Sequence, residues 1–240
     1  MYNSTMLNQF SRTEALINTS SLDKLRNSKV MIFGIGGVGG YILESLARCG
    51  IGEIHIVDND KISLTNINRQ IIALHSTIGM YKVDVAEKRA LDINPDIKIK
   101  KYKTFYLPEN KDEFDFSQYN YIIDAIDTVK AKISIIEEAK KNNIPIVSAM
   151  GAGNKLDPCK FEVADISKTS VCPLARVIRL ELKKKNIKDV KVVYSKEKPV
   201  KTKDKNELTA SGYPVPASIA FCPAAMGLII ASVVIQDLIK

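Results

Sequence analysis

The sequence contains little of what metal centres and disulfide scaffolds require. Among its 240 residues there are two histidines and four cysteines, and no two cysteines have C-x-x-C spacing. This pattern argues against a four-thiolate zinc site and against a disulfide framework. We therefore expect reduced thiols, and we expect His55 and His75 to be structural rather than part of a metal site or catalytic triad. The cysteines are Cys49, Cys159, Cys172 and Cys222.

The chain also lacks the patterns that direct a protein into or across a membrane. Residues 1–10 are polar and lack the basic-then-apolar order of a secretory signal, so we expect a cytoplasmic protein. Residues 208–236 carry no charge and could cross a bilayer as one helix. Three prolines, Pro214, Pro216 and Pro223, interrupt this stretch. We therefore predict a buried strand over residues 218–221 and a core helix over residues 223–239, while peripheral membrane contact stays open.

Composition is consistent with one folded domain that carries a local excess of positive charge. The chain is 45% hydrophobic with a mean hydropathy of -0.04, enough to bury a full core. Ten lysines and three acidic residues lie between Lys183 and Lys205, which accounts for most of the net charge of +8. This basic strip could neutralise a polyphosphate backbone. A solvated helix end followed by a lysine-rich loop explains it equally well.

Apolar patterning predicts alternating strands and helices. The predicted strands cover residues 29–33, 53–57, 97–102, 121–126, 144–148, 161–166 and 190–194, and the predicted helices cover residues 38–48, 80–93, 129–142 and 173–185. This order indicates an α/β fold with a Rossmann-like, doubly wound and mostly parallel sheet, followed by a C-terminal antiparallel extension. We divide the domain, residues 1–240, into a helical leader (1–28), a nucleotide-binding core (29–153) and a substrate-side segment (154–240). A cap at residues 20–23 begins the predicted leader helix, which ends near Asn27.

A glycine-rich run directly follows the first predicted strand, Gly34-Ile35-Gly36-Gly37-Val38-Gly39. Such glycines permit a tight turn, let backbone amides approach phosphate oxygens and direct a helix N-terminus at their charge. Asp58 ends the second predicted strand 24 positions after Gly34. This is close to the roughly 20-residue offset at which a carboxylate meets ribose hydroxyls. These features alone fit NAD as well as ATP.

Cationic residues further along the chain separate the two interpretations. Hydride transfer has no use for an arginine beside a triphosphate, whereas attack on an α-phosphate must neutralise the charge on the departing pyrophosphate. Arg69 and Lys82 meet that need. Asp124 and Asp127 close a buried strand, at the edge where ligands of open α/β sheets bind. Structural alternatives stay open, since Asp58 could cap a turn, Lys82 could be solvated and Asp127 could cap the next helix.

Together these motifs resemble those of the ubiquitin-activating-type superfamily of adenylating enzymes, the ThiF, MoeB and HesA group. The residues that carry the resemblance are Gly34-x-Gly36-Gly37-x-Gly39, Asp58-x-Asp60, Asn66-x-Asn68-Arg69-Gln70, Lys82 and Asp124-x-x-Asp127. Within the group, four further segments are similar to the tRNA threonylcarbamoyladenosine dehydratase branch: Phe10-Ser11-Arg12-Thr13-Glu14, Ile93-Asn94-Pro95, Asp124-Ala125-Ile126-Asp127 and Gly151-Ala152-Gly153.

The resemblance implies an ATP-dependent cyclisation of threonylcarbamoyladenosine in tRNA. The glycine loop would hold phosphates and Asp58 the ribose, with Asp60 also in the nucleotide site. Asn66, Arg69, Gln70 and Lys82 would bind the triphosphate, and Asp127 would bind Mg²⁺. The implied catalytic set is Arg69, Lys82, Asp127 and Arg12. In the family two subunits pack about a two-fold axis, so Arg12 would reach into the partner subunit's site.

Other interpretations remain open at this stage. The nearest is adenylation of the C-terminal glycine of a ubiquitin-like sulfur carrier, against which the missing C-x-x-C pairs weigh. A NAD-dependent oxidoreductase and a non-catalytic nucleotide-binding scaffold are further alternatives, and docking of a sulfur-transfer partner protein is undecided. Cys172 occupies the loop in which related enzymes carry a nucleophilic cysteine, with Arg176 and Arg179 on the following helix. The proposed cyclisation needs no enzyme nucleophile, so we expect Cys172 to be non-catalytic.

Overall fold

A seven-stranded sheet forms the centre of the molecule in the computed structural model, which describes residues 7–201 and 215–240. The strand order is β3-β2-β1-β4-β5-β7-β6, and every pairing is parallel except that of β6 with β7. The strands are β1 (Lys29–Phe33), β2 (Glu53–Val57), β3 (Lys98–Tyr102), β4 (Tyr121–Asp124), β5 (Ile146–Ala149), β6 (Phe161–Asp165) and β7 (Lys191–Ser195). The predicted doubly wound fold with an antiparallel C-terminal extension is confirmed.

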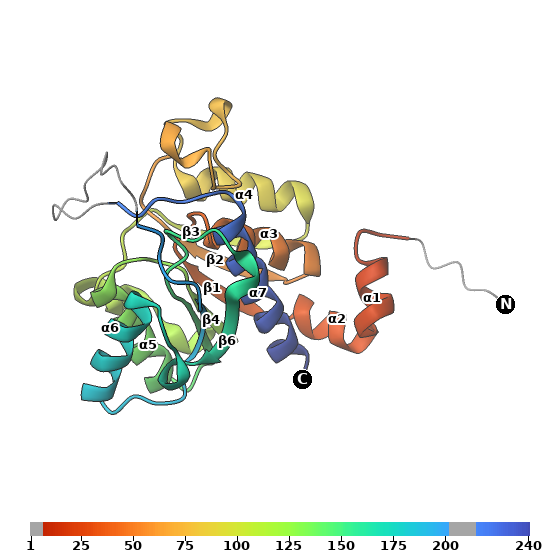
Figure 1. Cartoon of the computed structure of the whole chain (residues 1–240). Helices are drawn as coiled ribbons and strands as arrows, with labels where there is room; N and C mark the ends of the chain where they lie inside the picture. The colour runs from red at the N-terminus through yellow and green to blue at the C-terminus, as the bar shows by residue number, and fades with distance from the viewer. Residues whose placement is uncertain (1–6, 202–214) are drawn as a thin grey trace.

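Helices cover both faces of the sheet (Figure 1). They are α1 (Ser11–Ile17), α2 (Thr19–Arg26), α3 (Gly39–Cys49), α4 (Lys82–Ile93), α5 (Val129–Lys141), α6 (Pro173–Lys184) and α7 (Phe221–Ile239). Short 3₁₀ turns occur at Leu64–Asn66, His75–Thr77, Pro108–Glu113, Phe116–Gln118, Pro158–Lys160 and Ile166–Lys168. Alternate residues of β1 serve two cores, because Val30 and Ile32 pack with α3, α4 and α7, and Met31 and Phe33 pack with α5 and α6.

The C-terminal apolar segment differs in part from its prediction. Residues 218–220 are irregular rather than a strand, and α7 begins at Phe221. Pro223 can lie inside the first turn of α7, because the amides of a first turn have no intrahelical acceptor and proline loses no hydrogen bond there. The helix can therefore begin before the proline. The helix is long and apolar enough to cross a membrane by length and composition, a test that core helices also pass. Here Met226, Ile230 and Val234 are buried in the core, so α7 is the predicted core helix.

Close backbone contact explains why α7 lies against α3. A Cβ at Gly227 would lie 2.6 Å from the carbonyl oxygen of Val38, so only glycine permits this approach. The leader joins the same assembly, because Lys24 of α2 donates a hydrogen bond to the carbonyl oxygen of Ile239. The leader prediction needs one correction: α2 is capped by the side chain of Asn18, which accepts a bond from the Ser21 amide.

The boundaries of several other elements differ from prediction by one or two residues at either end. β4 ends at Asp124, two residues earlier than expected, because the chain turns outward there to line a cavity. The strand order also reverses between β1 and β4. In open α/β sheets this switch point is where ligands bind, at the carboxyl ends of the strands.

Candidate nucleotide-binding site

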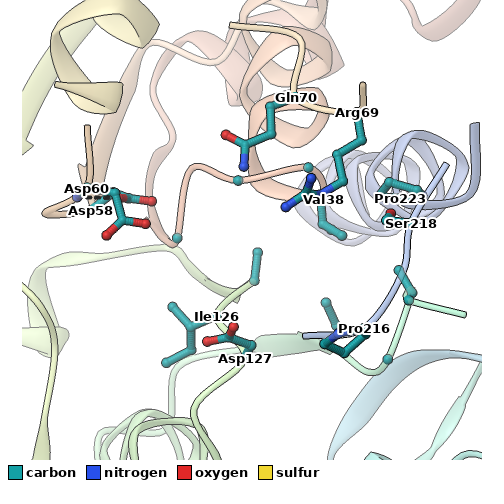
Figure 2. Close-up of a pocket in the computed structure, with 18 of the residues that line it drawn as sticks. Val38, Asp58, Asp60, Arg69, Gln70, Ile126, Asp127, Pro216, Ser218 and Pro223 are labelled. Carbon is teal, nitrogen blue, oxygen red and sulfur yellow. Dashed lines mark hydrogen bonds between the residues drawn. The ribbon is translucent and has the colours of Figure 1, made fainter. Parts of the chain in front are cut away.

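A cavity of about 740 Å³ opens at the switch point between β1 and β4. It is lined by segments that lie far apart in the sequence: residues 33–38, 57–61, 125–127, 149–155, 172–174 and 215–218. Figure 2 shows side chains that line this space, with Gln70 and Arg69 on one side and Ile126 and Asp127 on the other. The fold therefore collects most of the predicted motif residues in one place.

The glycine loop between β1 and α3 forms one wall of this cavity. Gly34 has φ +89° and donates its amide to the Val57 carbonyl oxygen at 2.8 Å, which bends the chain sharply at the end of β1. A Cβ at Gly39 would lie 1.8 Å from the Gly34 carbonyl oxygen. α3 begins at Gly39 behind Val38, whose apolar side chain cannot accept a bond from the first amides. The Gly40 amide donates to the Gly36 carbonyl oxygen, and the Tyr41 and Ile42 amides donate to the Val38 carbonyl oxygen. The amides of residues 36–39 have no acceptor among the described residues, so they can receive an anion.

Asp58 connects the glycine loop to the end of β2. Its carboxylate accepts bonds from the Ile35 amide at 2.8 Å and from the Asp60 amide at 2.9 Å. Burial raises the pKa of Asp58, although Lys82 and the two amides act in the opposite direction. Each carboxylate oxygen accepts one of these bonds and keeps capacity for a second donor, as a ribose hydroxyl requires.

Lys82 is buried and engaged by acids. Its Nζ donates to Asp60 Oδ2 at 2.6 Å and lies 3.9 Å from Asp58 Oδ2. The alternative of a solvated lysine is therefore wrong, since Lys82 is 6% exposed. Lys82 also lines the cavity, so it can reach a phosphate by exchanging the exposed Asp60 for it.

Arg69 and Gln70 face the glycine loop from the opposite side of the cavity (Figure 2). The aliphatic part of Arg69 packs on Gly37, and its Nη1 donates to the Thr65 carbonyl oxygen and Asn68 Oδ1, both at 2.9 Å. Gln70 is 6% exposed, and its Oε1 is buried with no hydrogen-bond partner among the residues that the structure describes. A buried orphan acceptor is costly and indicates a missing donor from a ligand.

Asn66 lines the cavity but has a local structural role. Its Oδ1 accepts a bond from the Ser63 amide at 3.1 Å and so caps the 3₁₀ turn Leu64–Asn66. Asp127, after β4, is exposed and lines the cavity, and it accepts a 3.4 Å bond from Thr128 Oγ1. Asp124 is fully buried and paired with Lys132 at 2.8 Å, so it orients its neighbours rather than reaching a ligand.

The metal prediction is compatible with this carboxylate. No cluster of three or more histidine, cysteine or acidic side chains that could hold a metal lies in residues 7–201 or 215–240. Mg²⁺ does not require one, because it is often bound by one or two carboxylates together with substrate phosphates and water. The exposed Asp127 at the cavity wall fits that mode.

Two predicted site residues do not line the cavity. Gly39 is buried at the start of α3, and Arg12 lies elsewhere on the molecule. Arg12 is exposed on α1, on the far side of α2 from the sheet (Figure 1). The cavity residues that the sequence motifs do not predict include Asn154 and Lys155, which lie directly after the Gly151-Ala152-Gly153 motif. The available signal is a lysine two positions after the glycine-rich segment 151–153 that follows the strand. Cys172 is buried and lines the cavity beside them.

The chain is similar to known proteins over almost its whole length. A family model described as the ThiF family matches residues 10–240. A protein from Bacillus subtilis (strain 168) named tRNA threonylcarbamoyladenosine dehydratase is 43% identical over 245 residues, covering 98% of this chain and 96% of that protein. A protein of the same name from Haemophilus influenzae is 43% identical over 169 residues, covering 70% of this chain and 65% of that protein.

Two solved structures of an E. coli enzyme are also similar to this chain in fold. The crystal structure of the E. coli tRNA N6-threonylcarbamoyladenosine dehydratase TcdA in complex with ATP has a TM-score of 0.86 and 33% identity, and the match covers 96% of this chain and 93% of that chain. The structure of the same E. coli enzyme with AMP has a TM-score of 0.87. The chain belongs to the ThiF family.

Proposed function

We propose that this protein is an ATP-dependent tRNA threonylcarbamoyladenosine dehydratase, which activates the carboxylate of the modified nucleoside by adenylation and closes it into a ring. The observation that carries the proposal is the cavity itself. It places the glycine loop, Arg69, Lys82 and Asp127 around one space, in a chain similar almost end to end to a protein of that name.

The reaction would proceed in two steps. A carboxylate oxygen of the substrate attacks the α-phosphorus of ATP, a new C–O–P link forms, and the bond to the β-phosphate breaks with release of pyrophosphate. The substrate's own urea group then attacks the activated carbonyl carbon, AMP departs with the bonding electron pair, and one proton is released. The tethered nucleophile supplies proximity, so the protein contributes positioning and charge neutralisation.

Most of the predicted residues have a role in this scheme. The amides of the glycine loop and the N-terminus of α3 receive phosphate oxygens, Asp58 receives the ribose hydroxyls, and Gln70 Oε1 accepts a bond from the nucleotide. Arg69 and Lys82 neutralise the departing pyrophosphate. Asp127 would hold Mg²⁺, which when bound neutralises phosphate charge.

We further propose that residues 1–240 act as one adenylating domain, in the cytoplasm and as a homodimer. Arg12 points to the dimer, because it is exposed and remote from the cavity of its own chain. It would contact nucleotide only in the partner subunit's site. The alternative substrate, the C-terminal glycine of a sulfur-carrier protein, would use the same adenylation chemistry.

The decisive experiment is mass spectrometry of tRNA nucleosides after incubation of purified protein with ATP, Mg²⁺ and tRNA that carries threonylcarbamoyladenosine. We expect the loss of one water from that nucleoside, dependent on ATP, and release of AMP. Pyrophosphate exchange stimulated by a carrier protein and not by this tRNA would instead favour the alternative substrate.

An Arg69→Ala variant tests the nucleotide assignment separately. Removing the guanidinium should abolish ATP-dependent dehydration, because it takes away the positive charge that packs beside Gly37 of the glycine loop. A dehydrogenase would bind a nicotinamide dinucleotide nearly as well without this arginine. Calorimetry with ATP and with NAD on wild type and variant therefore separates the two functions.

A further inference from the structure

The cavity has a second end that the nucleotide does not account for. Figure 2 places Pro216 across the cavity from Asp58 and Asp60, with Asp127 between them. Gly153 lies against Pro216, because a Cβ at that glycine would be 2.7 Å from the Cβ of Pro216. Residues 151–155 therefore line one end of the cavity, and the ribose position at Asp58 lies at the other end, with Asp127 between them.

Lys155 supplies a buried positive charge at this second end. The residue is 3% exposed, and its Nζ donates to the carbonyl oxygen of Glu197. The Glu197 carboxylate is already occupied by the amides of Leu156 at 3.1 Å and Asp157 at 3.0 Å. Among residues 7–201 and 215–240, no carboxylate oxygen lies within 4.0 Å of Lys155 Nζ, so Lys155 forms no ion pair there.

Burial without a counter-ion is unfavourable for an ammonium group. It lowers the pKa of Lys155, while the nearby Glu197 and thiol groups act weakly in the opposite direction. An ammonium group has three N–H donors, and the Glu197 carbonyl oxygen uses one of them. An anionic ligand in the cavity would supply the missing partner.

Asn154 adds an unused acceptor next to this charge. Its backbone is held at φ +56°, because its amide donates to the Ala217 carbonyl oxygen at 2.7 Å and its carbonyl accepts from the Val200 amide at 2.9 Å. Its side-chain Oδ1 is buried and has no hydrogen-bond partner among the described residues. The left-handed backbone and the unpaired acceptor both cost free energy. We therefore expect a ligand to donate a hydrogen bond to Asn154 Oδ1.

We propose that Asn154 and Lys155 form the subsite for the acyl substrate, in which the Lys155 ammonium pairs with the substrate carboxylate and Asn154 Oδ1 accepts the neighbouring urea N–H. This inference rests on the proposed function. The matching chemical class is an N-carbamoyl amino acid, which carries a carboxylate and an N–H on the same carbon. Lys155 is then a substrate-positioning group that turns the carboxylate toward the α-phosphate near Asp127.

The test measures binding rather than turnover, with the free nucleoside threonylcarbamoyladenosine and its methyl ester as probes. Calorimetry is run in the presence of a non-hydrolysable ATP analogue and Mg²⁺. A charge-assisted hydrogen bond contributes about 1.5–3 kcal/mol, so wild type should bind the acid about 10- to 100-fold more tightly than the ester. In Lys155→Gln this preference should fall to within about twofold.

Two further variants make the result specific. Asn154→Gly keeps the left-handed backbone that glycine accepts readily, so it should weaken acid and ester equally, by about fivefold. Lys184→Gln removes an exposed lysine at the end of α6, remote from the cavity, and should leave both affinities unchanged. If Lys155→Gln does not fold, as judged by circular dichroism, Lys155→Arg replaces it and should retain the acid preference.

Retention of the full acid preference in Lys155→Gln would overturn the inference. So would tighter binding of a glycylglycine peptide than of the nucleoside, because it would assign the subsite to a protein C-terminus. The proposed function is judged separately, by the loss of water from intact tRNA with wild-type protein. Failure of that reaction, with the acid preference intact, would reject the function and not the subsite.

Discussion

Two glycines of the same loop should respond to alanine in opposite ways. At Gly39 a Cβ would lie 1.8 Å from the Gly34 carbonyl oxygen, whereas ordinary contact begins at 3.4 Å. The obstacle is backbone at the tight turn after β1, so no side-chain rotation relieves it. At Gly36 the nearest heavy atom to a Cβ would be Gln70 Nε2 at 4.0 Å, and φ is not left-handed there. Gly39 therefore serves the fold, and Gly36 serves the ligand.

The magnitudes follow from these distances. Overpacking of a rigid site costs about 1–3 kcal/mol or more, and we expect Gly39→Ala to lose about 3 kcal/mol of unfolding free energy. For a chain of this length this lowers Tm by about 6–12 °C. Gly36→Ala should stay within about 0.5 kcal/mol of wild type, yet bind ATP at least about tenfold more weakly, because its methyl group fills space meant for a phosphate.

Thermal melts without ligand and ATP calorimetry on both variants measure these quantities. The reasoning would be refuted if Gly39→Ala melted at the wild-type temperature, or if Gly36→Ala lost stability while binding ATP normally. Either result would mean that the loop adopts a different path from the one described. The two variants act as controls for each other, since both add one methyl group to the same motif.

Two further predictions concern buried polar groups away from the loop. Lys132→Met leaves the fully buried Asp124 carboxylate without its 2.8 Å partner. Removal of one member of such a pair lowers the free energy of unfolding by about 3–5 kcal/mol. Urea denaturation measures this loss, and a value below about 1 kcal/mol would contradict the ion pair. Burial lowers the pKa of His55 below 6.5, outweighing its bond with Glu53, so the unfolded state binds the proton more readily. Stability is therefore complete above about pH 6.5 and falls as the pH drops below it. Denaturation at pH 7.5 and pH 5 should show a smaller decline in His55→Gln than in wild type.

The sheet could be predicted because its central strands are short apolar runs bounded by turn residues. β1 and β2 are rich in valine and isoleucine and are followed by glycine or aspartate, so both were predicted with their observed bounds. The same pattern of apolar residues gave a wrong strand prediction for residues 218–221. Four apolar or small residues have no decisive period, and Pro223 is compatible with the first turn of a helix as well as with a break before one.

Motif residues of the site were predictable for a related reason, since their roles depend on local backbone. Gly34 and Asp58 act through the turn after β1 and the end of β2, both of which sequence spacing fixes. Partnerships across the fold were not predictable. The engagement of Lys82 by Asp60 joins residues 22 positions apart, and the burial of Lys155 depends on how residues 196–200 pack over it. Tertiary contacts of this kind leave no periodic signal in the chain.

The lysine-rich strip is continuous in the sequence, but the fold divides it between two separate surfaces, which the sequence alone does not predict. Pro173 at the start of α6 lines the cavity, so the 12 residues of the helix carry the chain to the opposite edge of the sheet, about 18 Å away. Lys184 and Lys185 lie there and pair with Glu181 and Glu137. β7 then returns toward the cavity, where Pro199 lines its wall. Lysines 183–188 therefore form a solvated helix end remote from the substrate. Of the described part of the strip, residues 196–201 follow β7 and lie at the cavity edge of the sheet, so their lysines are the ones placed to assist a nucleic acid there.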